Sequence, residues 1–297
     1  MIKIGFLDSG IGGIAVLHQA LKVLPQEEFL YYADEDHVPY GIRTQAEIEQ
    51  YVDEGVRFLI EQGARAIVVA CNTATSAAIG YVRERYDLPI LGMEPAVKPA
   101  VERAGGKRVL VTATPFTIRE ERLHHLVRLV DKEHLVTLKA LPELVKFAEK
   151  GEFYSPAVRA YLNREFSDID LMDYSEIVLG CTHFTFFRQI LSELAGPGVE
   201  LIDGGEGTVR HLKNRIEPLQ ETEEPSGEDE AAEGAGRISY FISGRPVEDP
   251  NPGFLRETAR PAGLKQGGTD EKDPVFTAGC LPAGPLSYDR ACPRGRG

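Results

Sequence analysis

Two cysteines stand in matching sequence contexts that favour proton-transfer chemistry. Cys71 and Cys181 each follow a short apolar run and precede a helical pattern. The residues behind them are small and polar, Asn72-Thr73 after the first and Thr182-His183 after the second. Because ligands of open α/β sheets bind at the carboxyl ends of strands, we expect both thiols to point into a cleft. We also expect the N-terminus of each following helix to lower the thiol pKa from its usual value of about 8.5.

Other roles for these cysteines fit the sequence less well. A single buried cysteine is more often a packing residue, but two in matching positions with polar neighbours favour catalysis. Neither has a Cys-x-x-Cys or His-x-x-His partner, so zinc is a poor alternative. A disulfide is disfavoured in a reducing cytosol. Two thiols that face each other suit the inversion of a stereocentre, because one thiolate removes a proton and the opposite thiol returns one to the other face.

The N-terminal loop Asp8-Ser9-Gly10-Ile11-Gly12-Gly13 is a second candidate binding element. Its glycine spacing differs from Gly-x-Gly-x-x-Gly, so a dinucleotide-binding function has weak support. The glycines allow close backbone approach, and the N–H groups of the following helix suit a carboxylate. Asp8 is either a helix cap or a group that binds a substrate ammonium or tunes a cysteine. Pro39-Tyr40-Gly41 is predicted to form a turn from its composition.

The elements that must position these residues follow an alternating pattern. Short β-branched runs alternate with helical patterns, and this order predicts parallel sheets flanked by helices. The run at 66–70 is too apolar to alternate, so both faces of that strand should be buried. The predicted strands cover 2–7, 29–32, 66–70, 108–111, 177–179, 200–202 and 237–243. The first predicted helix follows Gly12-Gly13 and ends near 24, and the other predicted helices cover 44–62, 73–86, 116–130, 184–194 and 206–216.

The two halves of the chain resemble each other. The run 67–73, which contains Cys71, is similar to the run 177–183, which contains Cys181. We therefore predict an α/β protein with two similar lobes, each a mainly parallel sheet flanked by helices, and an active site in the cleft between them. The predicted lobe one covers 1–95 plus 205–243, lobe two covers 96–204, an acidic loop covers 221–236, and an irregular or disordered tail with Cys280 and Cys292 as free surface thiols covers 245–297.

Composition excludes several classes of protein. The 297 residues include 46 acidic and 33 basic side chains, for a net charge of −13. This balance argues against a nucleic acid or an anionic membrane as the main partner. No run approaches the ~20 apolar residues that a membrane span needs. An acid at position 8 comes too early for a signal peptide, so we predict a cytoplasmic protein.

Four motifs together resemble those of glutamate racemases. They are Asp8-Ser9-Gly10-Ile11-Gly12-Gly13, Val38-Pro39-Tyr40-Gly41, Ala70-Cys71-Asn72-Thr73-Ala74 and Leu179-Gly180-Cys181-Thr182-His183-Phe184. The resemblance covers about 1–217 and extends to the strand near 238–243. Aspartate racemases share the two-cysteine plan, but their second motif typically reads Cys-Thr-Glu. The sequence Cys181-Thr182-His183 therefore favours the glutamate branch.

The resemblance implies an enzyme that interconverts L- and D-glutamate without a cofactor or metal. Such enzymes supply D-glutamate to peptidoglycan, and a homodimer is expected. By motif match, Cys181 removes the proton from L-glutamate and Cys71 removes it from D-glutamate, while Asp8 and His183 tune the two thiols. The implied substrate contacts are Asp8, Ser9, Tyr40, Gly41, Asn72, Thr73, Thr182 and His183, and the implied assisting residues are Thr114, Thr117 and Glu149.

Two departures from the family pattern and two alternatives remain. The family usually has proline after the aromatic that follows Thr-His, whereas this chain has Phe184-Thr185. The tail after about 245 does not resemble the usual family C-terminus. One alternative is a racemase of aspartate or another amino acid from the same superfamily. The other is a racemase-like protein that binds a ligand without turnover, which the presence of both cysteines disfavours.

Overall fold

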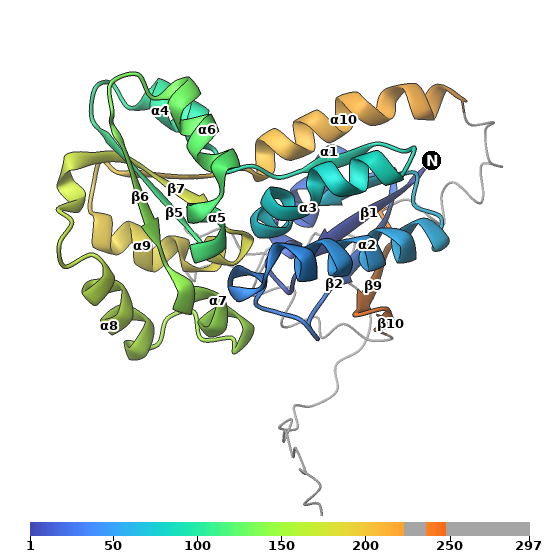
Figure 1. The fold of residues 1–297 in the computed structure, drawn as a ribbon, viewed down its shortest axis with the longest axis horizontal. Coiled ribbons are helices and arrows are strands. Elements are labelled where there is room, and N and C mark those ends of the chain that lie inside the picture. Colours follow the sequence, from blue (N-terminus) through green and yellow to red (C-terminus); the bar gives the residue numbers. More distant parts are fainter. Residues whose placement is uncertain (223–235, 248–297) are drawn as a thin grey trace, which may run out of the picture. The chain divides into compact units, whose positions relative to one another are not determined.

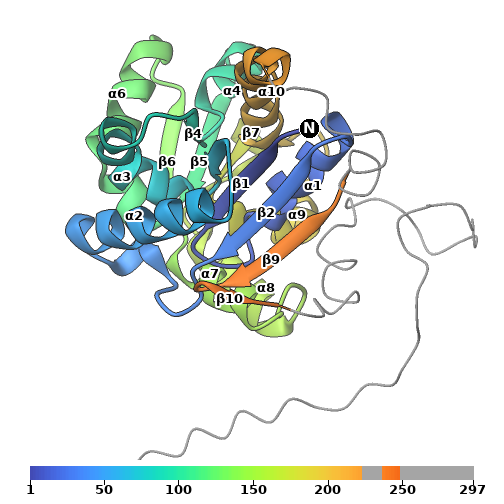
Figure 2. The same cartoon turned by 90° about the vertical axis from the view of Figure 1, so that its right-hand side faces the viewer.

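The N-terminal lobe is built on a six-stranded sheet in the computed structural model, which describes residues 1–222 and 236–247. The strand order is β10-β9-β2-β1-β3-β4, and every pair is parallel except β10 with β9. Figure 2 shows β9 beside β2. The strands are β1 (Lys3–Asp8), β2 (Glu28–Ala33), β3 (Ala66–Val69), β4 (Ile90–Gly92), β9 (Ile238–Ile242) and β10 (Arg245–Pro246). We call this sheet and its helices lobe one.

Helices cover both faces of the lobe-one sheet (Figure 1). The helices α2 (Gln45–Glu61) and α3 (Asn72–Arg85) pack on one face, where Leu7 and Leu30 point. The helices α1 (Ile14–Val23) and α10 (Gly205–Thr222) pack together on the other face. This alternation follows from the period-2 geometry of a strand, which sends successive side chains to opposite faces.

The second lobe, lobe two, has a four-stranded parallel sheet of order β6-β5-β7-β8. The helices α4 and α6 pack on one face, and α7, α8 and α9 pack on the other. The strands are β5 (Arg108–Ala113), β6 (Val136–Ala140), β7 (Tyr174–Gly180) and β8 (Glu200–Asp203), and the helices are α4 (Val97–Arg103), α5 (Pro115–Arg119), α6 (Glu121–Val130), α7 (Pro142–Glu149), α8 (Pro156–Glu165) and α9 (Arg188–Ala195).

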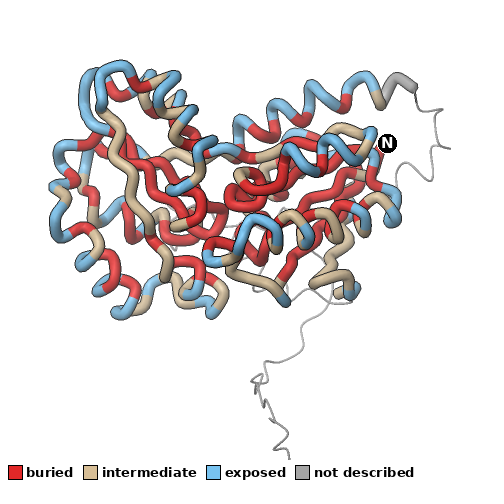
Figure 3. Tube along the Cα trace, in the orientation of Figure 1, coloured by how far each residue is buried: buried red, intermediate tan, exposed pale blue. Residues whose placement is uncertain are grey.

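One apolar cluster runs through both lobes. It contains Phe6 of β1 and Leu110 of β5, neither of which is exposed. Figure 3 shows the buried stretches along the strands. All described residues belong to one compact unit, Met1–Gly263, and the second unit, Leu264–Gly297, lies outside the described residues. Among the described residues, no helix is long and apolar enough to span a bilayer.

The predicted α/β class with two parallel sheets is confirmed, but two predicted helices were wrong in form. Glu120 has an extended conformation (φ −70°, ψ 131°) and separates α5 from α6, so 116–130 is not one helix. The predicted helix at 184–194 begins as the 3-10 helix η3 (Thr182–Phe187) and becomes α9 only at Arg188. Both departures follow from local backbone geometry that apolar spacing alone does not reveal.

Several elements are absent from the sequence prediction or differ from it. The elements β4, α4, β6, α7 and α8 were not predicted, and the turn at Tyr40 is the 3-10 helix η1 (Tyr40–Ile42). The predicted strand at 237–243 is confirmed as β9. Arg245 and Pro246 pair with β9 rather than beginning an irregular tail, and α10 extends into the predicted acidic loop as far as Thr222. The rest of that loop (223–235) and of the tail (248–297, with both of its cysteines) lies outside the described residues.

Candidate active site

The carboxyl ends of strands from the two lobes meet at the candidate site. Parallel pairing of β1 with β3 brings Asp8 and Cys71 to one edge of the lobe-one sheet. Parallel pairing of β5 with β7 sets Ala113 opposite Gly180, so Thr114 and Cys181 follow at one edge of the lobe-two sheet. The Thr182 hydroxyl donates to Asp8 Oδ2 over 3.0 Å, which joins the two edges directly.

Cys71 is the N-cap of α3 and is almost completely buried. Its Sγ accepts a hydrogen bond from the Ala74 N–H (3.4 Å) and lies 3.5 Å from Ser9 Oγ. Burial, reinforced by the Asp8 charge, raises the thiol pKa to about 12. The predicted lowering of this pKa was wrong, because the cost of burying a thiolate outweighs the hydrogen bond at the helix N-terminus.

The Asp8 carboxyl is fully buried beside this thiol. Its Oδ1 accepts from the Gly10 N–H (3.1 Å) and its Oδ2 from the Thr182 hydroxyl. Burial raises its pKa to about 6, although His183 and the two hydrogen bonds oppose the shift. Both oxygens are acceptors, one within the loop and one across the lobes, whereas the N-cap position of α1 is Gly13, so Asp8 is not the cap of that helix.

Cys181, His183 and Glu149 form a connected set. Cys181 Sγ lies 3.8 Å from His183 Nδ1, and His183 Nε2 contacts Glu149 Oε1. Burial disfavours the charged imidazole, but the hydrogen bonds and charges of Cys181 and Glu149 outweigh it and raise the His183 pKa well above 6.5. Glu149 also accepts from the Ile11 N–H (3.2 Å), which ties α7 to the N-terminal loop of lobe one. The His183 imidazole thus lies between the Cys181 thiol and the Glu149 carboxylate and contacts both.

A cluster of three hydroxyls spans the two lobes. Thr73 Oγ1 lies 2.9 Å from Thr114 Oγ1 and 3.3 Å from Thr117 Oγ1, and the Thr114 hydroxyl donates to Thr117 Oγ1 (3.1 Å). Thr114 is also the N-cap of α5. A Cβ on Gly41 would lie 2.8 Å from the Thr114 Cβ, so glycine permits this close approach of the lobes. The cluster provides several hydroxyl donors for an anionic group.

Two other predicted residues, Tyr40 and Asn72, form different kinds of hydrogen bond. The Tyr40 hydroxyl donates to Asp34 Oδ2 over 2.6 Å. Asn72 donates from Nδ2 to the Met93 carbonyl (3.1 Å), while its buried Oδ1 has no hydrogen-bond partner among the described residues. A buried acceptor without a partner carries a cost that a ligand N–H would remove.

All thirteen predicted residues therefore gather around the two facing strand edges. Sequence reasoning missed Asp34, which accepts from the Tyr40 hydroxyl and directly follows β2, one position beyond Ala33, the residue that pairs with Asp8 at the end of β1. An acid directly after a buried strand was the signal that could have identified it. Within the described part of the chain, no group of three or more His, Cys, Asp or Glu side chains is placed to hold a metal ion.

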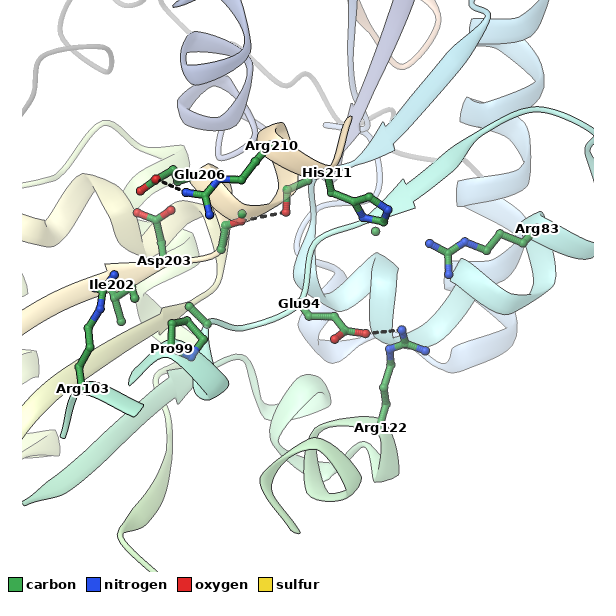
Figure 4. A pocket seen from close by; sticks show the side chains of 15 residues that line it. Arg83, Glu94, Pro99, Arg103, Arg122, Ile202, Asp203, Glu206, Arg210 and His211 are labelled. Carbon is green, nitrogen blue, oxygen red and sulfur yellow. Dashed lines mark hydrogen bonds and ion pairs between the residues drawn. The ribbon is translucent and has the colours of Figure 1, made fainter. Parts of the chain in front are cut away.

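The site is closed in this conformation. Cys71 and Cys181 are 3% and 5% exposed. Both cysteines are therefore almost completely shielded from solvent in this conformation. A separate pocket of about 530 Å³ is lined in part by the two chain segments that cross between the lobes, at Glu94 and at Gly204 (Figure 4). None of the predicted site residues lines this pocket.

Comparison with known proteins agrees with this geometry. The profile of the Asp/Glu/Hydantoin racemase family matches residues 13–212. A glutamate racemase from Halothermothrix orenii is 49% identical over 247 residues, which cover 83% of this chain and 95% of that protein. The chain belongs to the Asp/Glu/hydantoin racemase family, among its glutamate racemases. The resemblance noted in the sequence is thereby confirmed.

Other glutamate racemases extend the match. The protein from Lachnospira eligens is 47% identical over 250 residues, which cover 83% of this chain and 92% of that protein. The crystal structure of Escherichia coli glutamate racemase in complex with L-glutamate and the activator UDP-MurNAc-ala superposes with a TM-score of 0.69 at 25% identity, and covers 83% of this chain and 99% of that one. The two-lobed α/β architecture is thus that of glutamate racemase structures.

Proposed function

We propose that this protein interconverts L- and D-glutamate without a cofactor, with Cys71 and Cys181 as its two acid–base groups. The observation that carries the proposal is the placement of two buried thiols at facing strand ends of different lobes. Each thiol has its own polar neighbours, Ser9 for Cys71 and His183 for Cys181. The charge of Cys181 also contributes to the raised pKa of Cys71, as expected for thiols that share one site.

In the direction from L- to D-glutamate, Cys181 acts as the base. Its thiolate takes the proton from Cα, and the electron pair of the broken C–H bond remains on Cα, delocalised toward the carboxylate. The Cys71 thiol, whose pKa of about 12 keeps it protonated near neutral pH, donates its proton to the opposite face. Cys181 is then a thiol and Cys71 a thiolate, which is the state required for the reverse reaction.

The polar groups around the thiols account for substrate orientation. We assign a substrate carboxylate to the hydroxyl cluster of Thr73, Thr114 and Thr117, and the ammonium to the acceptors Asp8 and Asn72 Oδ1. The substrate ammonium would place a positive charge beside Asp8 and Cys71. This charge lowers the pKa of both side chains and so eases removal of the proton from the Cys71 thiol. We further propose a homodimer in the cytoplasm that supplies D-glutamate for peptidoglycan.

Racemisation assays on L-glutamate and L-aspartate test this function. We expect L-glutamate to be converted to the D enantiomer, with deuterium incorporated at Cα in D₂O, and L-aspartate to react at least about a hundredfold more slowly. Faster conversion of aspartate would assign the protein to another branch of the superfamily. Conversion of neither would leave a binding protein.

Replacing Asp8 by asparagine should stabilise the protein while slowing it. The Asp8 pKa is raised from 3.8 to about 6, so the folded state holds this proton more tightly than the unfolded state. The ionised carboxylate therefore costs folding free energy, up to about 3 kcal/mol above pH 6, and nothing below pH of about 4.

Thermal unfolding and kinetics measure both effects. Asp8→Asn should unfold at a higher temperature than the wild type near neutral pH, with the difference disappearing under acidic conditions. We expect kcat/KM to fall about tenfold, because the ammonium loses its charged partner. A difference in unfolding temperature between Asp8→Asn and the wild type that stays the same from about pH 4 to neutral pH would contradict the burial cost assigned to Asp8.

A further inference from the structure

The hairpin β9–β10 lies beside β2 (Figure 2), and the loop that carries Tyr40 and Gly41 begins directly after β2. The two segments are about two hundred residues apart in sequence but touch through β2, which pairs with β9. Asp34, directly after β2, starts the loop, and the Ser243 N–H donates to the Ala33 carbonyl (2.8 Å) at the same edge. The turn of the hairpin therefore lies next to the start of the loop.

The Asp34 carboxylate joins the hairpin to the predicted substrate contact. It accepts from the Tyr40 hydroxyl (2.6 Å), from His37 Nδ1 (2.9 Å) and from the Ser243 hydroxyl (3.3 Å). The Ser243 oxygen in turn accepts from the Asp36 N–H (3.1 Å). One serine side chain thus fixes both the backbone of the loop and the acceptor that orients Tyr40.

An ion pair adds a second link between the hairpin and the loop. Both terminal nitrogens of Arg245 donate to the Asp36 carboxylate, each over 2.8 Å. The pairing of Arg245 with Ile242 leaves Ser243 and Gly244 as a two-residue turn. Both have positive φ values, 45° and 81°, as in the hairpin turns that match strand twist. The turn directs Ser243 and Arg245 toward the loop.

We propose that Ser243 and Arg245 are positioning residues that set the Tyr40–Gly41 segment against the substrate. The inference rests on the proposed function, in which that segment contacts glutamate. Arg245 and Asp36 are exposed (63% and 49% for the side chains), and exposed ion pairs contribute little to global stability. Loss of either link should therefore change the loop without unfolding the protein.

The main test compares Ser243→Gly and Arg245→Ala with the wild type. Glycine tolerates the positive φ at 243, so this variant removes the hydroxyl without adding backbone strain. Each variant should raise KM for L- and D-glutamate about threefold to tenfold, the loss of one or two hydrogen bonds, with kcat changed less. Ser239→Ala, the same loss of a hydroxyl on β9 away from the loop, is the matched control and should keep the wild-type KM.

Two further measurements keep the inference falsifiable. Hydrogen exchange of peptides covering 34–43 should be faster in both variants and unchanged in peptides from α7, whether or not glutamate is the substrate. The double variant Asp36→Arg with Arg245→Asp restores an ion pair of opposite polarity, so its KM should be much closer to the wild-type value than the KM of Arg245→Ala.

The outcomes separate the two proposals. Wild-type KM and exchange in folded variants, an equal effect of Ser239→Ala, or no recovery in the double variant would overturn the positioning role. A wild-type protein that does not racemise glutamate would instead overturn the proposed function, and the exchange measurement would still decide whether the hairpin holds the loop.

Discussion

Replacing either Cys71 or Cys181 by serine should lower kcat/KM for glutamate racemisation by about a thousandfold, within the range of general acid–base groups. A serine hydroxyl is a far weaker acid than a thiol and does not form the oxyanion needed for proton abstraction. The fold should survive, since the hydroxyl is smaller and Cys71 already lies near Ser9 Oγ and the Ala74 N–H. Thermal unfolding of the variants checks this.

The equilibrium constant of racemisation fixes the ratio of kcat/KM for the two directions of the reaction. Enantiomers have equal free energies in water, so kcat/KM must be equal for L- and D-glutamate in every variant. Direction-specific roles therefore appear only in a half reaction. A glutamate analogue with chloride on the carbon next to Cα can lose HCl after one proton abstraction, since the electron pair expels chloride and no reprotonation is needed.

Elimination from the two enantiomers of this analogue assigns each cysteine. Cys71→Ser should still eliminate from the L analogue, where Cys181 is the base, and Cys181→Ser from the D analogue. Cys280→Ser and Cys292→Ser, which lie outside the described residues, are matched controls and should keep wild-type activity. A variant at Cys71 or Cys181 with near wild-type racemisation would remove that residue from the mechanism.

The sequence predicted the position of both thiols because the information is local. An apolar strand, a cysteine and a helical pattern place Cys71 and Cys181 at strand ends without knowledge of the rest of the fold. The pKa of Cys71 was mispredicted because burial depends on both lobes closing over the thiol. The helix α7 was missed, so Glu149 could be proposed only from the family resemblance.

The loop–hairpin contact was beyond sequence reasoning for a related reason. Ser243 and Asp34 are separated by 209 positions, and only the pairing of β9 with β2 brings them together. The strand itself was predicted from its apolar run. Its place in the sheet, and thus the function of the turn behind it, depends on a topology that periodicity does not specify.

Glu149→Gln should give the second-largest loss of activity, about a hundredfold in kcat/KM, the lower end of the acid–base range. The amide keeps the size of the side chain but removes the charge that helps to hold the proton on His183. The His183 pKa should fall, so the alkaline limb of the pH profile of kcat/KM should move to lower pH. Glu143→Gln, on the exposed side of the same helix, is the matched control.

The stability of this variant has its own pH signature. The His183 pKa is raised in the folded state, so its protonation stabilises the fold fully below about pH 6.5, its unfolded value, and this contribution is lost as pH rises through the folded value. Glu149→Gln should therefore be most destabilised relative to wild type near pH 6, and less so at alkaline pH. Thermal unfolding across this range measures the difference.

The elimination reactions show whether Glu149 acts on Cys181 through His183 or only holds the two lobes together. If Glu149 acts through His183 on Cys181, the variant should lose elimination from the L analogue and keep it from the D analogue. The Ile11 N–H also donates to Glu149, and a glutamine can accept that bond as well. Equal loss of both eliminations with an unshifted pH profile would mean that Glu149 only holds the lobes together, because a contact between the lobes serves both thiols alike.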